Sequence, residues 1–222
     1  MSDQSAGAMS EYLGSGEIVT PNLPAVTSLA ARLVPAGTPL PQSARALFEW
    51  VRDNIAYDVT SPFFLPEHYR PDFILERRRG FCIPKAVLLA ALARAAGIPA
   101  RLVFADIVNH LSPAELRQQM GTDVFAYHCY NELWLAGRWV KVVCSFDAAL
   151  CARHGFPLVE FDGRNDALFP SHDTSGRPFI EYVRTHGPRA DLPLAEVLDA
   201  WQQSYGSERV ALWRRMLEQA GY

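Results

Sequence analysis

The sequence has few cysteines, and none of them is spaced for a metal. The chain of 222 residues contains Cys82, Cys129, Cys144 and Cys151. No CxxC pair or Cys/His cluster shows zinc-binding spacing, so the sequence predicts no metal site, and it contains no cofactor motif either. In a cytosolic chain of this size we expect all four thiols to be reduced.

Targeting signals and long apolar runs are also missing. The opening residues, MSDQSAGAMSEYLG, contain neither the basic stretch nor the apolar stretch of a signal peptide. The longest apolar run, AVLLAALA, is far shorter than the ~20 residues of a membrane span. A net charge of −3 with no evident basic face argues against nucleic acid as a partner. We therefore expect a cytoplasmic protein that binds neither nucleic acid nor membrane; its oligomeric state is not indicated.

What the sequence does contain is typical of a globular α+β protein. Hydrophobic residues make up 49% of the chain and charged residues 20%. Periodicity, caps and breakers predict helices over 43–58, 71–80, 82–96, 112–121 (with Ser112 as N-cap and Pro113 first), 193–204 and 207–219, and a strand over 100–107. We expect one domain with a loose lead-in over 1–20, a core over 21–150, and a C-terminal extension over 151–222 that holds mostly loop, one strand candidate and the last two helices.

Two apolar stretches around Ala136-Gly137 predict a β-hairpin, AYHCYNELWL (126–135) and RWVKVVCSF (138–146). A two-residue turn sets the pairing of the strands. The predicted pairs are Leu135 with Arg138, Trp134 with Trp139, Glu132 with Lys141 as an ion pair, Tyr130 with Val143, Cys129 with Cys144, and His128 with Ser145. The two cysteines would face each other at a hydrogen-bonded position, where the geometry disfavours a disulfide.

Cys82 lies at the edge of the long apolar run, in RRRGFCIPKAVLLAALARAAGIPARL. Proline is tolerated only in the first turn of a helix, so Pro84 places Cys82 close to the N-cap. The helix dipole there lowers a thiol pKa, and Lys85 and the three preceding arginines (77–79) would add to this effect. The alternative is a packing role for the thiol, with the arginines neutralising the preceding helix and Lys85 in solvent.

A nucleophilic cysteine needs a base, and the hairpin offers His128. In the predicted register Asp147 is a diagonal neighbour of His128 on the same face and can orient the ring, while Ser145 is a second candidate. Considered alone, a histidine of this kind is more often structural than catalytic. Three further histidines, His110, His154 and His172, lie in loop-like segments and rank lower as bases.

The stretch GFCIPKAVLLAALARAAGIPARLV resembles the signature of the transglutaminase-like superfamily. Arg94, Gly97, Ile98, Pro99, Ala100 and Arg101 stand in the family order. HCYNELWLAGRWVKVVCSFD resembles the second half of the signature, with a histidine, a tryptophan and an acidic residue. This similarity covers about residues 40–150. The family's acid usually follows the tryptophan by four residues, a position held here by Val143, whereas Asp147 comes four residues later.

The resemblance implies a papain-like transglutaminase core, in which a central helix with an N-terminal cysteine packs on an antiparallel sheet. It implies a cysteine-dependent hydrolase or acyltransferase that forms a thioester from a peptide or small amide and passes the acyl group to water or an amine acceptor. Cys82, His128 and Asp147 would form the triad, with the Cys82 N–H as one oxyanion donor and a second near 54–64. A binding module without activity and an amide-forming synthase are alternatives.

Overall fold

Helix α5 (Cys82–Ala95) is the central element of the computed structural model, which describes residues 9–222. The residues from Ile83 to Arg94 are buried, as expected for a helix that is apolar on all sides. The helix ends at Gly97, whose φ of 76° is left-handed, with Ile98 N–H bonded to the Ala93 carbonyl. This ending is a Schellman-type cap and agrees with the predicted stop.

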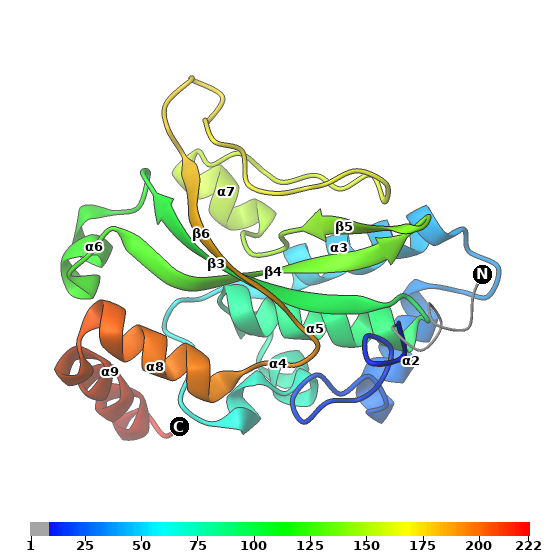
Figure 1. The fold of residues 1–222 in the computed structure, drawn as a ribbon, viewed down its shortest axis with the longest axis horizontal. Coiled ribbons are helices and arrows are strands. Elements are labelled where there is room, and N and C mark those ends of the chain that lie inside the picture. Colours follow the sequence, from blue (N-terminus) through cyan, green and yellow to red (C-terminus); the bar gives the residue numbers. More distant parts are fainter. Residues whose placement is uncertain (1–8) are drawn as a thin grey trace.

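An antiparallel sheet with the strand order β5-β4-β3-β6 packs against α5 (Figure 1). Its strands are β3 (Ala100–Asn109), β4 (Val124–Leu135), β5 (Arg138–Val142) and β6 (Ile180–Arg189). The turn between β4 and β5 has left-handed φ angles at Ala136 and Gly137, 49° and 86°, as a type I′ turn requires. The predicted pairing is confirmed from Leu135 with Arg138 through Asn131 with Val142.

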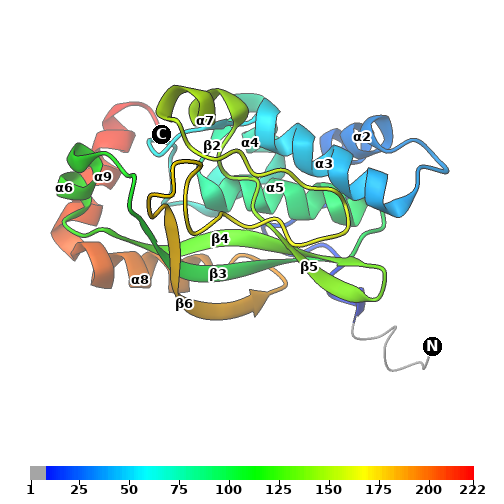
Figure 2. The same ribbon diagram turned by 90° about the horizontal axis from the view of Figure 1, so that it is seen from above.

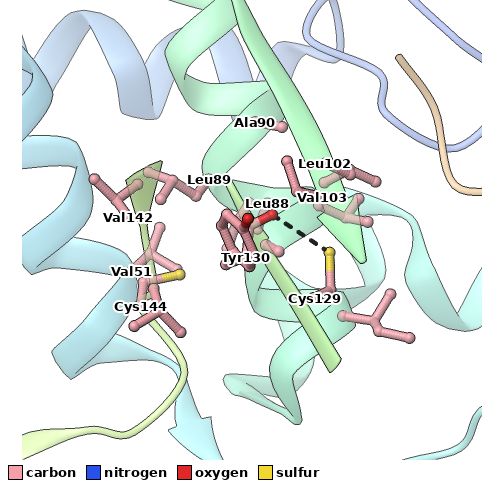
Figure 3. Close-up of a cluster of buried hydrophobic side chains, with 14 of the residues drawn as sticks. Val51, Leu88, Leu89, Ala90, Leu102, Val103, Cys129, Tyr130, Val142 and Cys144 are labelled. Atoms are coloured by element: carbon pink, nitrogen blue, oxygen red, sulfur yellow. Dashed lines mark hydrogen bonds between the residues drawn. The ribbon is translucent and has the colours of Figure 1, made fainter. Parts of the chain in front are cut away.

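The outer half of the predicted hairpin does not form. Strand β5 ends at Val142, and the N–H of Val143 donates to the Ala167 carbonyl, so the chain leaves β4 and pairs with a later segment. The predicted pairing of Cys129 with Cys144 is therefore absent, and Figure 3 shows the two thiols on opposite sides of the core cluster. All four cysteines are unbridged.

Cross-strand contacts near the turn are confirmed in part. The rings of Trp134 and Trp139 meet edge to face at 5.3 Å. Glu132 lies opposite Lys141, as predicted, but its ion pair is with Arg101 of β3, which binds the carboxylate at 2.6 Å and covers the Trp139 ring at 4.0 Å. Arginine is suited to bind a carboxylate and stack on an aromatic ring at once, so this signature arginine ties three strands together.

Helices α2 (Pro24–Leu33), α3 (Leu40–Asn54) and α4 (Pro71–Arg77) lie with α5 on one side of the strands (Figure 2). A short 3₁₀ helix, η1 (Pro66–Tyr69), and the parallel pair β1 (Ala56–Tyr57) and β2 (Arg79–Gly80) connect them. Helix α2 was not predicted, and α3 begins three residues earlier than predicted. Gly80 was predicted as the end of α4, but Arg78 holds the left-handed position, with a φ of 56°.

The remaining helices are α6 (Ala114–Met120), α7 (Ala148–His154), α8 (Leu194–Tyr205) and α9 (Ser207–Gln219). In both ribbon views α6, α8 and α9 gather at one end of the sheet (Figures 1 and 2). The two C-terminal helices were predicted, α7 was not, and Ser112 does not cap α6, whose N-cap is Pro113. Within residues 9–222, no helix is long and apolar enough to cross a membrane.

Candidate active site

Cys82 is the first residue of α5, as predicted, with Phe81 as N-cap and Pro84 in the first turn. Backbone hydrogen bonds from Ile83 and from Cys129 of β4 lower the pKa of the thiol, but burial outweighs them and raises it to about 11. The predicted lowering of this pKa is therefore wrong. The N–H groups at a helix start favour a thiolate, but here the surrounding apolar groups disfavour the charge more strongly.

The basic residues near Cys82 in sequence point elsewhere. The guanidinium of Arg77 lies over the Phe73 and Tyr222 rings, and that of Arg78 lies over Trp50. Lys85 is fully buried and not in solvent. Its ammonium donates to the carbonyls of residues 52 and 55 at the end of α3, and burial lowers its pKa to about 8. These cations hold neighbouring elements together and do not serve the thiol.

His128 lies on β4 and is only 5% exposed. The centroids of the Phe169 and Tyr182 rings lie 5.7 and 6.4 Å from that of the imidazole. Its Nε2 has no hydrogen-bond partner among the residues described. Burial lowers the pKa of the ring to about 3, because an apolar environment disfavours the imidazolium. The ring is therefore neutral at physiological pH.

The structure brings Cys82 and His128 to one cavity of about 550 Å³. The backbone of Cys129, one residue from His128, comes close enough to the Cys82 thiol to lower its pKa, so the thiol lies beside the strand. Asn131 reinforces the junction, since its side-chain amide donates to the Ala86 carbonyl of α5 at 2.9 Å. A neutral thiol and a neutral imidazole thus share one apolar space.

The triad's third member stays a prediction, because Asp147 has other partners here. Its carboxylate accepts from the N–H of Tyr57 at 2.7 Å and, as N-cap of α7, from the N–H of Leu150 at 2.8 Å. The predicted strand pairing does not extend to Ser145 and Asp147, since β5 stops three residues before Ser145. At the position where the family has its acid, Val143 is buried.

A β-bulge two residues before His128 was not predicted. The pairing of β3 with β4 shifts between Ala105 opposite His128 and Ile107 opposite Phe125, so Ala126 and Tyr127 together face Asp106. Tyr127 has a φ of 55°, which is unusual for a residue with a side chain. Bulges of this kind redirect the residues beside them.

Side chains from β3 and α8 take over the hydrogen bonds that the bulge breaks. The Ala126 N–H donates to the Tyr205 hydroxyl at 2.8 Å, and the Ala126 carbonyl accepts from Trp201 Nε1 at 2.9 Å. The Tyr127 N–H donates to Asp106 at 3.0 Å. No sequence signal marked these residues, because their function depends on contacts across distant segments.

A second polar cluster fixes the Tyr127 side chain. His186 of β6 stacks on the Tyr127 ring at 4.0 Å and bonds to Asp106 at 2.8 Å. The Tyr127 hydroxyl donates to Glu196 of α8 at 2.8 Å, and Arg189 pairs with the same carboxylate. Among the residues described, no group of His, Cys, Asp or Glu is arranged to hold a metal ion.

The model of the transglutaminase-like superfamily matches residues 27–144, more than half of the chain. The chain belongs to the transglutaminase-like superfamily. Cys82 and His128, the central helix and strands β3 to β5 all lie within this matched region. The expected papain-like architecture, with a cysteine at the start of a central helix packed on an antiparallel sheet, is confirmed.

Solved structures of other proteins are similar to this chain. A candidate cysteine protease from Cytophaga hutchinsonii has a TM-score of 0.54 and 19% identity, over 86% of this chain and 50% of its own. The periplasmic domain of TgpA from Pseudomonas aeruginosa has a TM-score of 0.46 and 26% identity, over 63% of this chain and 47% of its own. This chain therefore spans about half the length of either. No curated protein matches the sequence.

Proposed function

We propose that this superfamily member is a cysteine-dependent enzyme that transfers the acyl group of an amide or ester through a thioester on Cys82. The observation that carries the proposal is that Cys82 and His128 line one cavity, with the backbone of Cys129, the residue after the histidine, near enough to lower the pKa of the thiol. Superfamily membership supports the same residues. Substrates in this proposal are peptides or small amides, and the acceptor is water or an amine.

The raised pKa of the Cys82 thiol, about 11, and the lowered pKa of His128, about 3, favour a neutral pair over a preformed thiolate–imidazolium pair. His128 then acts as a general base: the thiol proton moves to the ring as sulfur bonds to the carbonyl carbon. The imidazolium returns that proton to the leaving amine as the C–N bond breaks. Water or an amine attacks the thioester and gives its proton to His128, and the imidazolium passes that proton to the Cys82 sulfur as the C–S bond breaks.

The Cys82 N–H is the natural donor to the oxyanion, because it lies at the positive end of α5. Segment 57–61, within the stretch where we expect a second donor, also lines the cavity. These donors matter more here than in a complete triad, because the imidazolium formed in the reaction has no acidic partner among the described contacts of His128.

A non-catalytic binding module is the second candidate function, and it is favoured by the absence of an acid beside His128 among the residues described. Val143 occupies the family's acidic position, and the neutral His128 has an unpaired Nε2. A site of this kind could bind the same ligand without forming a covalent bond.

Intact-mass spectrometry after incubation with p-nitrophenyl butyrate separates the two candidates. The native chain should gain one butyryl group. Cys82→Ala should gain none, and His128→Gln should gain it far more slowly. Cys151→Ala, which removes another buried thiol, is the matched control and should acylate normally. If the native chain neither retains a butyryl adduct nor releases p-nitrophenolate faster than Cys82→Ala, or if an adduct forms on folded Cys82→Ala, the proposal fails. Comparing how fast hydroxylamine and water remove the butyryl group from Cys82 then tests whether an amine is the acceptor.

A further inference from the structure

The walls of the cavity around Cys82 and His128 are almost entirely apolar. Aromatic and aliphatic side chains make up most of the lining, and the rest consists of short polar groups and two histidines, His128 and His154. Contact with such walls stabilises an apolar group because it removes apolar surface from water.

Charged groups are nearly missing from the lining. Among the described residues, Asp58 is the one Asp, Glu, Lys or Arg side chain on the wall. Its carboxylate accepts from the N–H and hydroxyl of Thr60, at 2.9 and 2.6 Å, and from the Ser61 hydroxyl at 3.4 Å. It is thus engaged within its own turn. A charged substrate group would lose hydration here without gaining an ion pair, which is unfavourable.

Part of the apolar wall comes from outside the superfamily's matched region. Trp201 and Tyr205 of α8 and Trp213, Met216 and Leu217 of α9 line the cavity, beyond residue 144, where the match ends. The matched region supplies the thiol, the imidazole and much of the wall, and the C-terminal helices add to that wall. The shape of the cavity therefore depends in part on segments that the superfamily match does not cover.

One hydroxyl on the wall has no partner. Ser112 is 5% exposed, lines the cavity, and its Oγ makes no hydrogen bond within the described part of the chain. Buried hydroxyl groups are nearly always hydrogen-bonded. A neutral polar atom on a ligand can satisfy this one without introducing a charge.

We infer that the acyl group carried by Cys82 is uncharged and apolar, an alkyl or aromatic group of small-molecule size with a neutral polar atom within reach of Ser112. This inference rests on the proposed function. The cavity of about 550 Å³ lies within the range of sites that enclose a small molecule. It excludes acyl groups that carry a carboxylate or an ammonium.

Alkylation of Cys82 by iodoacetamides tests the inference without a known substrate. The probes are iodoacetamide, N-hexyl iodoacetamide and 6-(iodoacetamido)hexanoic acid, which has a chain of similar length ending in a carboxylate. Sulfur displaces iodide in each case, and each rate is divided by that with glutathione. We expect the hexyl reagent to saturate the site and to react at least about tenfold faster than the carboxylate.

Two substitutions on α9 test whether the preference for the hexyl reagent depends on the cavity wall. Met216 and Leu212 are both exposed, 59% and 48%, but only Met216 lines the cavity. Met216→Glu should remove most of the preference for the hexyl reagent, and Leu212→Glu, the matched control, should leave it unchanged. Circular dichroism shows whether each variant keeps the fold.

The outcomes separate the two proposals. If Cys82 reacts with iodoacetamide but the hexyl and carboxylate reagents react equally, the apolar acyl group is ruled out while the nucleophile stands. Equal loss of preference in both α9 variants also overturns the assignment of the wall. If no reagent modifies Cys82, the proposed function itself fails and this inference with it.

Discussion

His128 is a titratable side chain held without charge in an apolar environment. Burial lowers its pKa to about 3, from 6.5 for a histidine in water. In the unfolded chain the ring takes up a proton below pH 6.5, whereas in the folded protein it remains neutral down to about pH 3. The unfolded state therefore binds more protons between these values, and the protein loses stability as the pH falls through that window.

Replacing His128 with leucine should remove this acid sensitivity. Between pH 7.5 and pH 5 the free energy of unfolding of His128→Leu should rise by roughly 2 kcal/mol relative to the native chain. The reason is that only the native chain gains a proton on unfolding at this position. Urea denaturation at several pH values measures the difference. It should be constant from pH 7.5 to 8.5, and a constant difference down to pH 5 would show that the ring is charged in the fold.

The identities of the two central residues could be predicted from the sequence, but their protonation could not. Pro84 fixed Cys82 at a helix start, and the strand pattern placed His128 on β4. The pKa of the thiol was predicted in the wrong direction, because the local helix terminus is visible in the sequence whereas burial by distant segments is not. Phe169, for example, packs on His128 from 41 residues away in the chain. Asp147 was assigned from the expected pairing of β5 with β4. Because β5 ends at Val142, that pairing does not reach Asp147 and the assignment is not tested.

At the scale of elements, the bulge in β4 is what connects the C-terminal helices to His128. Ala126 lies two residues before the histidine, and both of its backbone groups bond to α8 through Tyr205 and Trp201. A buried N–H without a partner lowers the free energy of unfolding by about 1–3 kcal/mol. By bonding to Ala126, α8 therefore stabilises the bulge, which the hydrogen bonds between β3 and β4 alone would not stabilise. α8 is in this sense part of the site although it brings no reacting group.

Tyr205→Phe should therefore lower both stability and reactivity. It leaves the Ala126 N–H unpaired, which we expect to cost about 1–3 kcal/mol in the free energy of unfolding, and it relaxes the bulge that positions His128. Tyr69→Phe is the matched control, because it removes a buried hydroxyl that bonds to the Phe63 carbonyl at 2.8 Å and not to β4. Acylation of Cys82 by p-nitrophenyl butyrate should slow more in Tyr205→Phe than in the control. Equal slowing would contradict a positioning role.

The boundaries of helices and strands could be predicted where their cause is local in the sequence, and not where it is a contact with a distant segment. Helix α5 and the turn at Ala136 and Gly137 were predicted because proline, glycine and periodicity act locally. The early end of β5 was missed, since Val143 bonds to Ala167, a residue that no local pattern marks as a strand partner. α7 was missed as well: it is only seven residues long, and its N-cap, Asp147, had been assigned to the triad.

At the scale of the whole molecule, Arg94 closes the end of α5 opposite the site. It is 4% exposed, and its guanidinium donates to the carbonyls of Gly14, Ala100 and Ala190. Asp191 adds to this junction by accepting from the N–H groups of residues 17–19. The arginine of the family signature thus has a structural function, joining the N-terminal segment, β3 and the end of β6.

Arg94→Lys separates this structural function from the chemistry of Cys82. Lysine keeps the charge but cannot present the planar fork that reaches three carbonyls, so the free energy of unfolding should fall by about 3 kcal/mol. Arg45→Lys, at an exposed arginine paired with Glu49, should change it by no more than about 0.5 kcal/mol. Arg94 lies twelve positions after Cys82, about 18 Å along the helix. Acylation of the folded variant should therefore proceed at the native rate, and a large loss of rate at native stability would show instead that the two ends of α5 are coupled.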